Sequence, residues 1–373
     1  MVVEPDSPQR IARLTPLSDV LARLDRVVRP VPPRASDLSA ALGSTLAEDV
    51  VANAPVPATA RALRDGWAVR ADHTTDAGTY APAPLPAAAR IDVGQPLAGD
   101  ADAVTPLDAV TVRNGMAQAL VPVGPGDGVL SAGADVAAGA VLMEAGRRLA
   151  RQQIEVLAAA GVAAVRIRAP RLRLVRVGQS GDVFIDAAFA CVADAIGARG
   201  GVAVTTGPDG LAHALVDPAV DAIVVVGGTG SGQSDATVRT LASMGEVHVH
   251  GVALLPGETT AFGAIGSRPV LALPGRLDAA LAAWHLLGQV MLARLAGSRE
   301  PECQRTAKLT HKVSSTVGLS ELVPVRCEGR LATPIASGYV PLSALAQANG
   351  WILIGPESEG YPASTEVMVR PWP

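Results

Sequence analysis

The chain has 373 residues, a net charge of −4 and 49% hydrophobic residues, of which few are aromatic. This length is enough for about two to four domains with a sizeable core. The acidic balance gives no general attraction for nucleic acid, so a nucleic-acid partner is not expected and any anionic ligand must be held by local groups.

The cysteines Cys191, Cys303 and Cys327 stand far apart, and no CxxC pair is present. This spacing argues against a disulfide framework and a structural zinc site, and it favours a reducing, cytoplasmic compartment. Residues 1–10 contain acids and prolines where a signal peptide would be basic and then apolar. The apolar run 277–295 is interrupted by two charged residues, a histidine and a glutamine, so we expect no membrane span.

Two short helices are expected beside an inserted domain. Residues 17–28 carry leucines and a valine at helical spacing and end before Pro30, and residues 152–160 show a second apolar stripe. We expect these helices to pair within a helical linker domain made of residues 1–47 and 145–170.

Short apolar runs cut by glycine and proline fill residues 48–144, which predicts an inserted β-rich domain. Residues 171–300 alternate strand and helix patterns, as in a three-layer α/β domain with a largely parallel sheet. Its expected strands are residues 172–177, 202–205, 222–226, 247–249 (at the edge) and 269–273. Residues 301–373 contain short strands separated by turns, which predicts a small C-terminal β-barrel or sandwich.

A glycine-rich turn, residues 227–232, follows the buried strand 222–226 and precedes a helix that Ser234 or Asp235 could cap. Backbone N–H groups without side chains and a helix N-terminus together favour an anion site. The pattern is neither a P-loop nor GxGxxG with a downstream acid. The alternative is a tight turn that binds nothing, and a Gly228→Val change would test the site while leaving the fold intact.

Two acids, Asp182 and Asp235, fall in turns at the carboxyl ends of strands, where ligands of such sheets lie. Together they could hold Mg²⁺ beside a phosphate. The alternative is that both only cap helices. His248 and His250 alternate along a strand, but a third metal ligand is missing nearby, so a surface strand is favoured over a metal pair.

Three arginines, Arg61, Arg64 and Arg70, surround residues 65–68. They form either a solvated loop or the cationic contacts that a phosphorylated ligand needs.

Short motifs along nearly the whole chain resemble the molybdopterin molybdenumtransferase family, the type represented by MoeA and the gephyrin E domain. They are Asp65-Gly66-Trp67-Ala68-Val69, Gly94-Gln95-Pro96, Gly133-Ala134-Asp135-Val136, Ser180-Gly181-Asp182, Gly227-Gly228 with Gly232 and Asp235, His250-Gly251-Val252, Pro256-Gly257, Leu273-Pro274-Gly275 and Ala348-Asn349-Gly350.

This resemblance implies a homodimer of four-domain subunits, in which the α/β domain binds the pterin phosphate and the partner's β domain closes the site. It implies insertion of molybdate into adenylated molybdopterin with Mg²⁺ and release of AMP. The implied catalytic residues are Asp65, Asp135, Asp182 and Asp235, of which Asp182 and Asp235 would bind the metal. The implied ligand-binding residues are Ser180, Gly181, Gly227, Gly228, Gly230, Gly232, Pro274, Gly275 and Arg276.

The chain departs from the family pattern at groups expected to handle molybdate and phosphate, so it resembles a divergent member. Val93 and Ala134 replace a threonine and a glutamate, and Leu255 and Glu258 replace two lysines. Two hypotheses remain open. The chain is either a transferase with weakened activity, or a non-catalytic protein that holds molybdopterin or docks onto a molybdoenzyme or another cofactor-synthesis protein.

Overall fold

The computed structural model describes residues 9–205 and 210–372. The chain forms two compact units. Unit 1 contains Met1–Glu48, Ala145–Ile154 and Ala164–Pro373, and unit 2 contains Asp49–Glu144 and Glu155–Ala163. This multidomain α/β plus β architecture confirms the fold class expected from the sequence.

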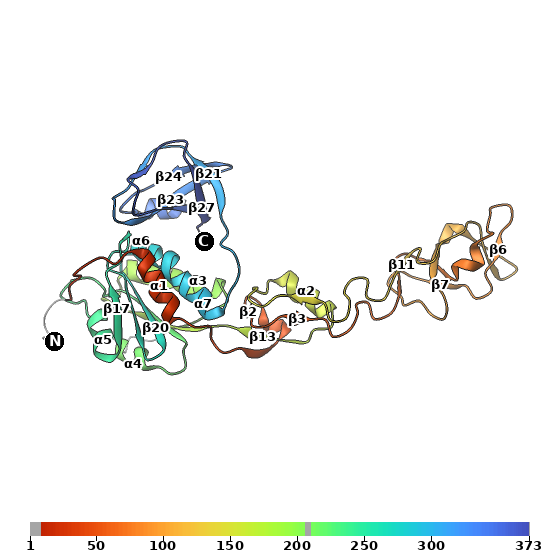
Figure 1. Cartoon of the computed structure of the whole chain (residues 1–373), viewed down its shortest axis with the longest axis horizontal. Helices are drawn as coiled ribbons and strands as arrows, with labels where there is room; N and C mark the ends of the chain where they lie inside the picture. The colour runs from red at the N-terminus through yellow and green to blue at the C-terminus, as the bar shows by residue number, and fades with distance from the viewer. Residues whose placement is uncertain (1–8, 206–209, 373) are drawn as a thin grey trace. The chain divides into compact units, whose positions relative to one another are not determined.

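A six-stranded mixed sheet forms the centre of unit 1 (Figure 1). Its order is β15 (Val202–Thr205), β14 (Arg171–Arg176), β16 (Ala222–Val226), β20 (Arg268–Leu273), β19 (Ala261–Ile265) and β17 (Glu246–His250). The first four strands are parallel, and β19 and β17 run antiparallel. The sequence did not predict β19, which returns into β20 through a two-residue turn that contains Gly266 at φ 59°. The predicted edge position of residues 247–249 is confirmed.

Helices cover both faces of this sheet, which makes three layers. Because side chains alternate along a strand, Val224 of β16 packs into one layer and Val225 into the other. The first face carries α1 (Leu17–Val27), α3 (Val183–Ala198) and the continuous helix α6 (Leu277–Ala283), η4 (Trp284–Gly288) and α7 (Gln289–Ala296). The second face carries α4 (Leu211–Val216) and α5 (Thr237–Met244).

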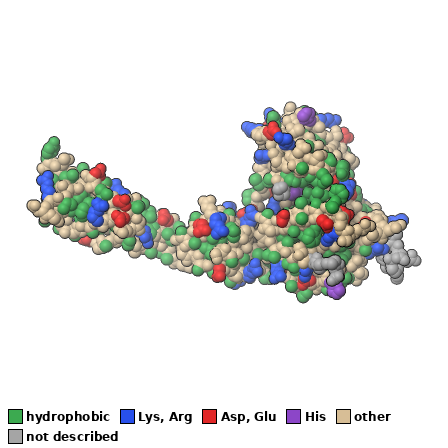
Figure 2. Space-filling view, turned by 180° about the vertical axis from the view of Figure 1, so that it is seen from behind, with side chains coloured by type: hydrophobic (Ala, Val, Ile, Leu, Met, Phe, Trp, Pro, Cys, Tyr) green, Lys and Arg blue, Asp and Glu red, His purple; other side chains and the backbone are tan. Residues whose placement is uncertain are grey.

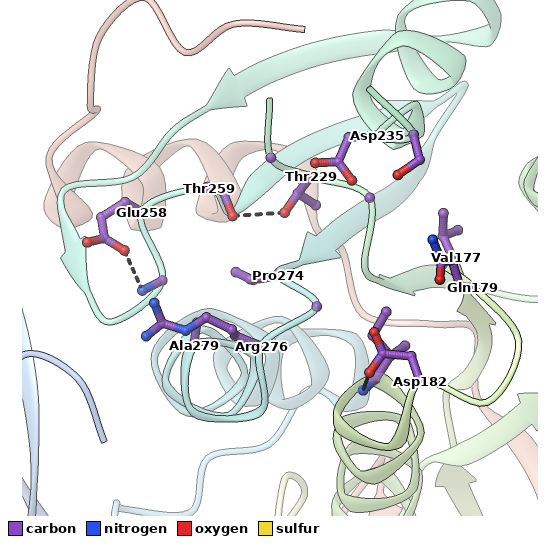
Figure 3. A pocket seen from close by; sticks show the side chains of 17 residues that line it. Val177, Gln179, Asp182, Thr229, Asp235, Glu258, Thr259, Pro274, Arg276 and Ala279 are labelled. Carbon is purple, nitrogen blue, oxygen red and sulfur yellow. Dashed lines mark hydrogen bonds between the residues drawn. The ribbon is translucent and has the colours of Figure 1, made fainter. Parts of the chain in front are cut away.

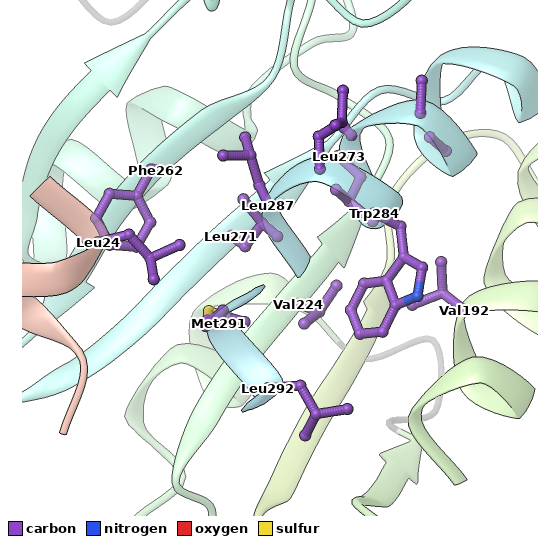
Figure 4. Close-up of a cluster of buried hydrophobic side chains, with 14 of the residues drawn as sticks. Leu24, Val192, Val224, Phe262, Leu271, Leu273, Trp284, Leu287, Met291 and Leu292 are labelled. Carbon is purple, nitrogen blue, oxygen red and sulfur yellow. The ribbon is translucent and has the colours of Figure 1, made fainter. Parts of the chain in front are cut away.

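The largest core cluster lies on the first face. Trp284, Leu287 and Met291 point from the long helix toward Leu271 and Val224 of the sheet (Figure 4). By length and composition the helix Leu277–Ala296 is apolar enough to cross a membrane. However, 72% of its apolar 18-residue stretch is buried inside the protein. Its apolar side chains therefore supply the core of unit 1.

The first helix, α1, was expected to pack on the second helix, but it packs on this sheet instead. Leu17, Val20 and Leu24 of α1 belong to the same cluster as Phe262 and Leu271. Figure 4 shows Leu24 beside Phe262. Tertiary contact with a larger apolar surface therefore decides the position of α1, which the stripe of leucines alone does not specify.

The segment expected to be a helical linker also contains a three-stranded sheet. Strand β13 (Ala164–Arg168) lies between β1 (Arg34–Asp37) and β2 (Thr45–Leu46), and η1 (Leu38–Ala41) connects the two outer strands. The second helix, α2 (Arg151–Ala159), covers nearly the same residues as the expected helix 152–160.

Unit 2 is built from short strands, as expected. One sheet has β5 (Gly66–Val69) between β7 (Ala89–Ile91) and β8 (Ala103–Pro106), and another has β10 (Met116–Ala119) between β6 (Ala83–Pro84) and β9 (Val110–Arg113). Two pairs complete it, β3 (Val50–Val51) with β12 (Val141–Met143) and β4 (Arg61–Ala62) with β11 (Val129–Leu130). Short 3₁₀ turns follow β5 and β8, at η2 (Ala71–Thr74) and η3 (Leu107–Ala109).

The C-terminal part of unit 1 is a closed five-stranded barrel, which confirms the predicted β-barrel. Its strands follow in the ring β23 (Ser320–Glu328), β24 (Leu331–Pro334), β21 (Arg305–Leu309), β27 (Glu366–Pro371) and β25 (Gly350–Ile354), and β25 pairs back onto β23. The short strand β18 (Leu254–Leu255) extends β23, and β22 (Val313–Ser314) pairs with β26 (Gly360–Tyr361). Helix α8 (Leu342–Gln347) lies between β24 and β25 in the sequence.

Candidate ligand pocket at the carboxyl edge of the α/β sheet

A pocket of about 560 Å³ lies where three parallel strands end. Its walls come from residues 177–179 after β14, 228–230 after β16 and 274–276 after β20, together with residues 257–259. Because parallel strands end at one edge of a sheet, these turns meet although they are far apart in the sequence. Figure 3 shows Thr229 and Asp235 across the pocket from Pro274 and Arg276.

The pocket brings together many of the residues expected at the site. Those that line it are Asp182, Asp235, Gly228, Gly230, Pro274, Gly275 and Arg276. Other expected residues are not among its lining: Ser180, Gly181, Gly227 and Gly232 in unit 1, and Asp65 and Asp135 in unit 2. The sequence reasoning missed Val177, Gln179, Thr229 and Thr259. The first three adjoin glycines of these turns, which is their only signal, and Thr259 follows Glu258 without such a signal.

The two pocket acids have different structural roles. Asp182 caps α3, because its Oδ1 accepts hydrogen bonds from the N–H groups of Phe184 at 3.0 Å and Ile185 at 3.3 Å. Asp235 does not cap α5, which begins after Ala236; its Oδ2 accepts from the N–H of Gly232 at 3.0 Å. The alternative that both acids are helix caps is therefore wrong for Asp235. Within the described residues, no group of three or more metal-binding side chains is present.

Every carbonyl oxygen of residues 227–230 accepts a hydrogen bond from the protein. Thr237 Oγ1 donates to Gly227 O at 2.8 Å, and His250 Nε2 donates to Thr229 O at 3.0 Å. Gln9 Nε2 donates to both Gly228 O and Gly230 O at 2.7 Å. The carbonyl oxygens of the loop, which carry the negative ends of the peptide dipoles, therefore point toward donors of the protein.

The N–H groups of the same peptides have no such partners. In a trans peptide the N–H points opposite to the C=O, so the N–H groups of residues 228–231 point away from these donors. Within residues 9–205 and 210–372, none of these four N–H groups donates to a protein acceptor. Successive unpaired N–H groups in a glycine turn form a concave site for an anion.

The N-terminus of α5 does not contribute to this site as the sequence suggested. The N–H groups of Val238 and Arg239 donate to Gln9 Oε1, at 3.1 and 3.3 Å, and the N–H of Thr237 donates to Gly228 O. Because these first-turn donors are occupied, the capacity to bind an anion lies in the loop alone.

The glycines of the loop differ in whether they could be replaced by a residue with a side chain. Gly227 and Gly228 have φ values of 100° and 69°, in the left-handed region. A Cβ on Gly228 would lie 2.5 Å from Thr237 Oγ1 and 2.8 Å from Val177 Cγ1. The expectation that Gly228→Val leaves the fold intact is therefore wrong. Gly232 has no such φ, and its Cβ would meet only the side chain of Asp235, at 3.1 Å.

We expect Gly228→Val to lower the free energy of unfolding by about 1–3 kcal/mol through backbone strain and overlap. Gly232→Ala should change it much less, because the Asp235 side chain can move. Thermal unfolding of both variants checks this prediction, and a Gly228→Val protein as stable as the wild type would contradict it.

Most of the charged side chains that line the pocket are acidic. Its lining includes Asp182, Asp235 and Glu258, and Arg276 is the only arginine or lysine among its lining residues, all of which lie in the described part of the chain. Glu258 keeps its carboxylate beside the pocket by accepting from the N–H of Gly257 at 3.0 Å (Figure 3).

Arg276 is already engaged by the protein. It donates twice to the buried carboxylate of Asp278, at 3.0 and 2.7 Å, and lies over the Tyr339 ring at 5.3 Å. The bond with Asp278 raises the pKa of Arg276 above its ordinary value, and the charge of Glu258 adds to this effect. Arg276 therefore offers a ligand less free positive charge than an unpaired arginine would.

The expected acids of unit 2 lie in exposed loops. Asp65 Oδ1 accepts from the N–H of Val93 at 2.8 Å, and Asp135 lies beside the bridge between Val56 and Val136. Of the arginines near Asp65, Arg61 donates to Gly94 O at 2.7 Å, and Arg70 binds Asp72 and Asp100. These two arginines hold loops of their own unit together. Figure 2 shows positive and negative side chains interspersed over one face of the protein.

The fold and the pocket define a multidomain protein with a ligand site at the carboxyl edge of a mixed α/β sheet. Three family models match the chain along most of its length. Residues 15–161 match the MoeA N-terminal region (domain I and II), residues 198–294 a probable molybdopterin binding domain, and residues 306–372 the MoeA C-terminal region (domain IV).

Individual proteins agree with these matches. The chain is 28% identical to molybdopterin molybdenumtransferase 2 of Mycobacterium tuberculosis, over 94% of this chain and 97% of that protein. It is 26% identical to the molybdopterin molybdenumtransferase of Haemophilus influenzae, over 71% and 73%. The crystal structure of a molybdopterin biosynthesis MoeA protein from Pyrococcus horikoshii matches with a TM-score of 0.80 and 29% identity, over 96% of this chain and 99% of that one.

The chain belongs to the MoeA-type molybdopterin molybdenumtransferase family, which acts in molybdenum cofactor biosynthesis.

Proposed function

We propose that the pocket binds the phosphate of molybdopterin, or of its adenylated form, through the loop of residues 228–231. The observation that carries this proposal is the set of four N–H groups with no protein acceptor in the described residues, beside a pocket large enough for an organic ligand. Such groups are preorganised donors for phosphate oxygens.

Asp182 and Asp235 would hold Mg²⁺ next to that phosphate. Each uses one carboxylate oxygen on a backbone N–H, which orients the side chain, and both line the pocket. Two carboxylates plus phosphate oxygens are a donor set that Mg²⁺ commonly accepts. When bound, the ion would offset the negative charge that phosphate and these acids bring together.

Insertion of molybdate would be weak in this chain. Molybdate is a dianion, and the adenylated pterin carries a pyrophosphate, so their approach requires cations in place. Instead, Glu258 lines the pocket where the family pattern has a lysine, and Arg276 is bonded to Asp278. The same acidic lining supports the second candidate, a non-catalytic protein that holds molybdopterin or docks onto a molybdoenzyme or another cofactor-synthesis protein.

The test is to incubate the purified protein with adenylated molybdopterin, molybdate and Mg²⁺ and to follow AMP release. Binding of the pterin with AMP release well below that of a full-motif family member is the expected result. AMP release at the rate of that relative would refute weak insertion. Failure to bind the pterin at all would refute the proposed ligand. Mass spectrometry of any small molecule that co-purifies with the native protein gives an independent reading.

We expect a cytoplasmic homodimer, in which unit 2 of the partner would supply Asp65 and Asp135 to complete the site. The resemblance to the family implies this arrangement, and both acids lie in exposed loops of unit 2. Sedimentation at micromolar concentration should therefore give twice the chain mass, and a monomer would contradict the prediction. If the dimer forms, Asp65→Asn should lower AMP release without lowering the affinity for the pterin phosphate.

A further inference from the structure

Gln9 is a buried residue near the N-terminus that contacts the glycine loop from 219 positions away in the sequence. Its amide nitrogen donates to Gly228 O and Gly230 O, both at 2.7 Å. Its amide oxygen accepts from the N–H groups of Val238 and Arg239. These four bonds use both N–H donors and both acceptor positions of one side-chain amide. The side chain is only 6% exposed, so water competes little for these bonds.

The positions of these contacts fix which way two peptides of the loop face. Gly228 O and Gly230 O converge on one nitrogen, so the N–H groups of Thr229 and Ser231 must point away from Gln9. Thr229 and Gly230 line the pocket, and Gln9 does not. The geometry points to Gln9 as a positioning residue, which holds the carbonyls of the loop away from the ligand so that its N–H groups face an oxyanion. This inference rests on the proposed function of the loop.

Without such a residue the loop could turn over. Gly228 and Gly230 precede the two peptides that Gln9 holds, and glycine allows the following peptide to rotate at little steric cost. A rotated peptide would place a carbonyl oxygen where the N–H had been, and its dipole would then repel a phosphate. Preorganised donors bind well because no reorientation is needed when the ligand arrives. The amide of Gln9 supplies this preorganisation for two peptides at once.

The N-terminal segment that carries Gln9 is itself attached near the pocket. Thr15 N donates to Gly251 O at 2.9 Å, and Ala253 N donates to Thr15 O at 2.8 Å. Residues 251–253 lead directly into the turn of Gly257 and Glu258 on the opposite wall of the pocket. Residues 9–15 thus connect two turns that form the site, and this attachment limits the freedom of Gln9.

The experiment compares two variants that separate the role of the amide nitrogen of Gln9, which donates to the loop, from that of its amide oxygen, which accepts from α5. Gln9→Met keeps the length of the side chain and removes all four bonds. Gln9→Glu keeps an acceptor for Val238 and Arg239, favoured by the N-terminal dipole of α5, but loses both donors to the loop. Gln347→Met, at an exposed residue of α8, is the matched control.

Loop order and ligand affinity are measured on the full chain. In both Gln9 variants we expect the ¹⁵N order parameters of Thr229 and Ser231 to fall from about 0.85 toward 0.6. The affinity for molybdopterin should fall roughly 3- to 10-fold, as expected for the loss of one or two positioning hydrogen bonds. Hydrogen exchange of Val238 should rise in Gln9→Met and remain slow in Gln9→Glu. The control should change none of these quantities.

The outcomes separate this inference from the proposed function. Unchanged order parameters in Gln9→Met, or a more mobile loop with unchanged affinity, would overturn the inference. A wild-type protein that does not bind molybdopterin would refute the proposed ligand, and the order parameters would then decide alone whether Gln9 fixes the loop.

Discussion

Lowering the pH from 6.5 to about 4 should reduce the free energy of unfolding by about 3 kcal/mol through His285 alone. His285 is 5% exposed and lies between the rings of Trp351 and Trp372, at 5.8 and 5.2 Å. Burial, with a smaller contribution from the charge of Arg199, lowers its pKa from 6.5 to about 4.

The sign follows from proton binding. Between pH 6.5 and about 4 the unfolded chain binds a proton at His285 that the folded chain does not, so stability falls as the pH falls through this window. Gln289 Nε2 donates to Nδ1 of the ring at 2.9 Å, a bond that the neutral imidazole accepts and the protonated ring would lose. The contribution of His285 is fully present above pH 6.5.

The measurement is urea unfolding at several pH values for wild type, His285→Gln and His311→Gln. The slope of stability against pH should be smaller in His285→Gln between pH 4 and 6.5. His311 is exposed, so His311→Gln should keep the wild-type slope. Equal slopes for wild type and His285→Gln would show that burial does not hold this histidine neutral.

Local patterns predicted the parallel strands well. β16 and β15 begin and end at the residues expected from their apolar, β-branched runs. β16 is a central parallel strand with all five residues buried, so it has a continuous apolar run, whereas β15 lies at the edge of the sheet and is recognised by its β-branched residues. Strand β19 was missed because the glycine in its centre, Gly263, weakens the strand signal, and its pairing depends on the neighbouring β20.

The candidate site was only partly predictable, for a different reason. Glycines and acids after strands indicated where the pocket lies, because the position of a turn is a local property. The partners of the loop carbonyls are not local. Gln9 and His250 reach the loop from other segments, and no periodicity relates them to it, although His250 belongs to one of the short motifs. His250 was considered as a metal ligand or surface residue, whereas its ring supports Thr229.

The same limit applies to the charges. Arg276 was expected among the ligand-binding residues, and it follows the strand 269–273 at the carboxyl edge of the sheet. Whether its guanidinium is free to contact a ligand depends on the buried Asp278 two residues later and on Tyr339 from the C-terminal barrel. Sequence reasoning cannot establish which of several nearby partners a long side chain will choose.

Reversing the charge at residue 258 should give the largest change in the activity of the pocket. Glu258 lines the pocket, whereas Leu255, the other residue where the family pattern has a lysine, lies in β18 outside the lining. We therefore expect Glu258→Lys to raise molybdate-dependent AMP release and Leu255→Lys to leave it nearly unchanged. The removal of one preorganised donor typically costs about 10²–10³ in rate, and solvent around a half-buried side chain weakens this effect. A gain of about tenfold is expected on that basis.

Glu258→Gln separates the two parts of this change. It removes the negative charge and retains an oxygen that can accept from the N–H of Gly257. Its rate should lie between those of the wild type and Glu258→Lys, because repulsion is relieved but no cation is added. Equal rates for Glu258→Lys and Leu255→Lys would mean that the field at residue 258 does not limit the approach of molybdate. A high ionic strength should reduce the difference between Glu258→Gln and Glu258→Lys, since salt screens the partly exposed charge on which that difference depends.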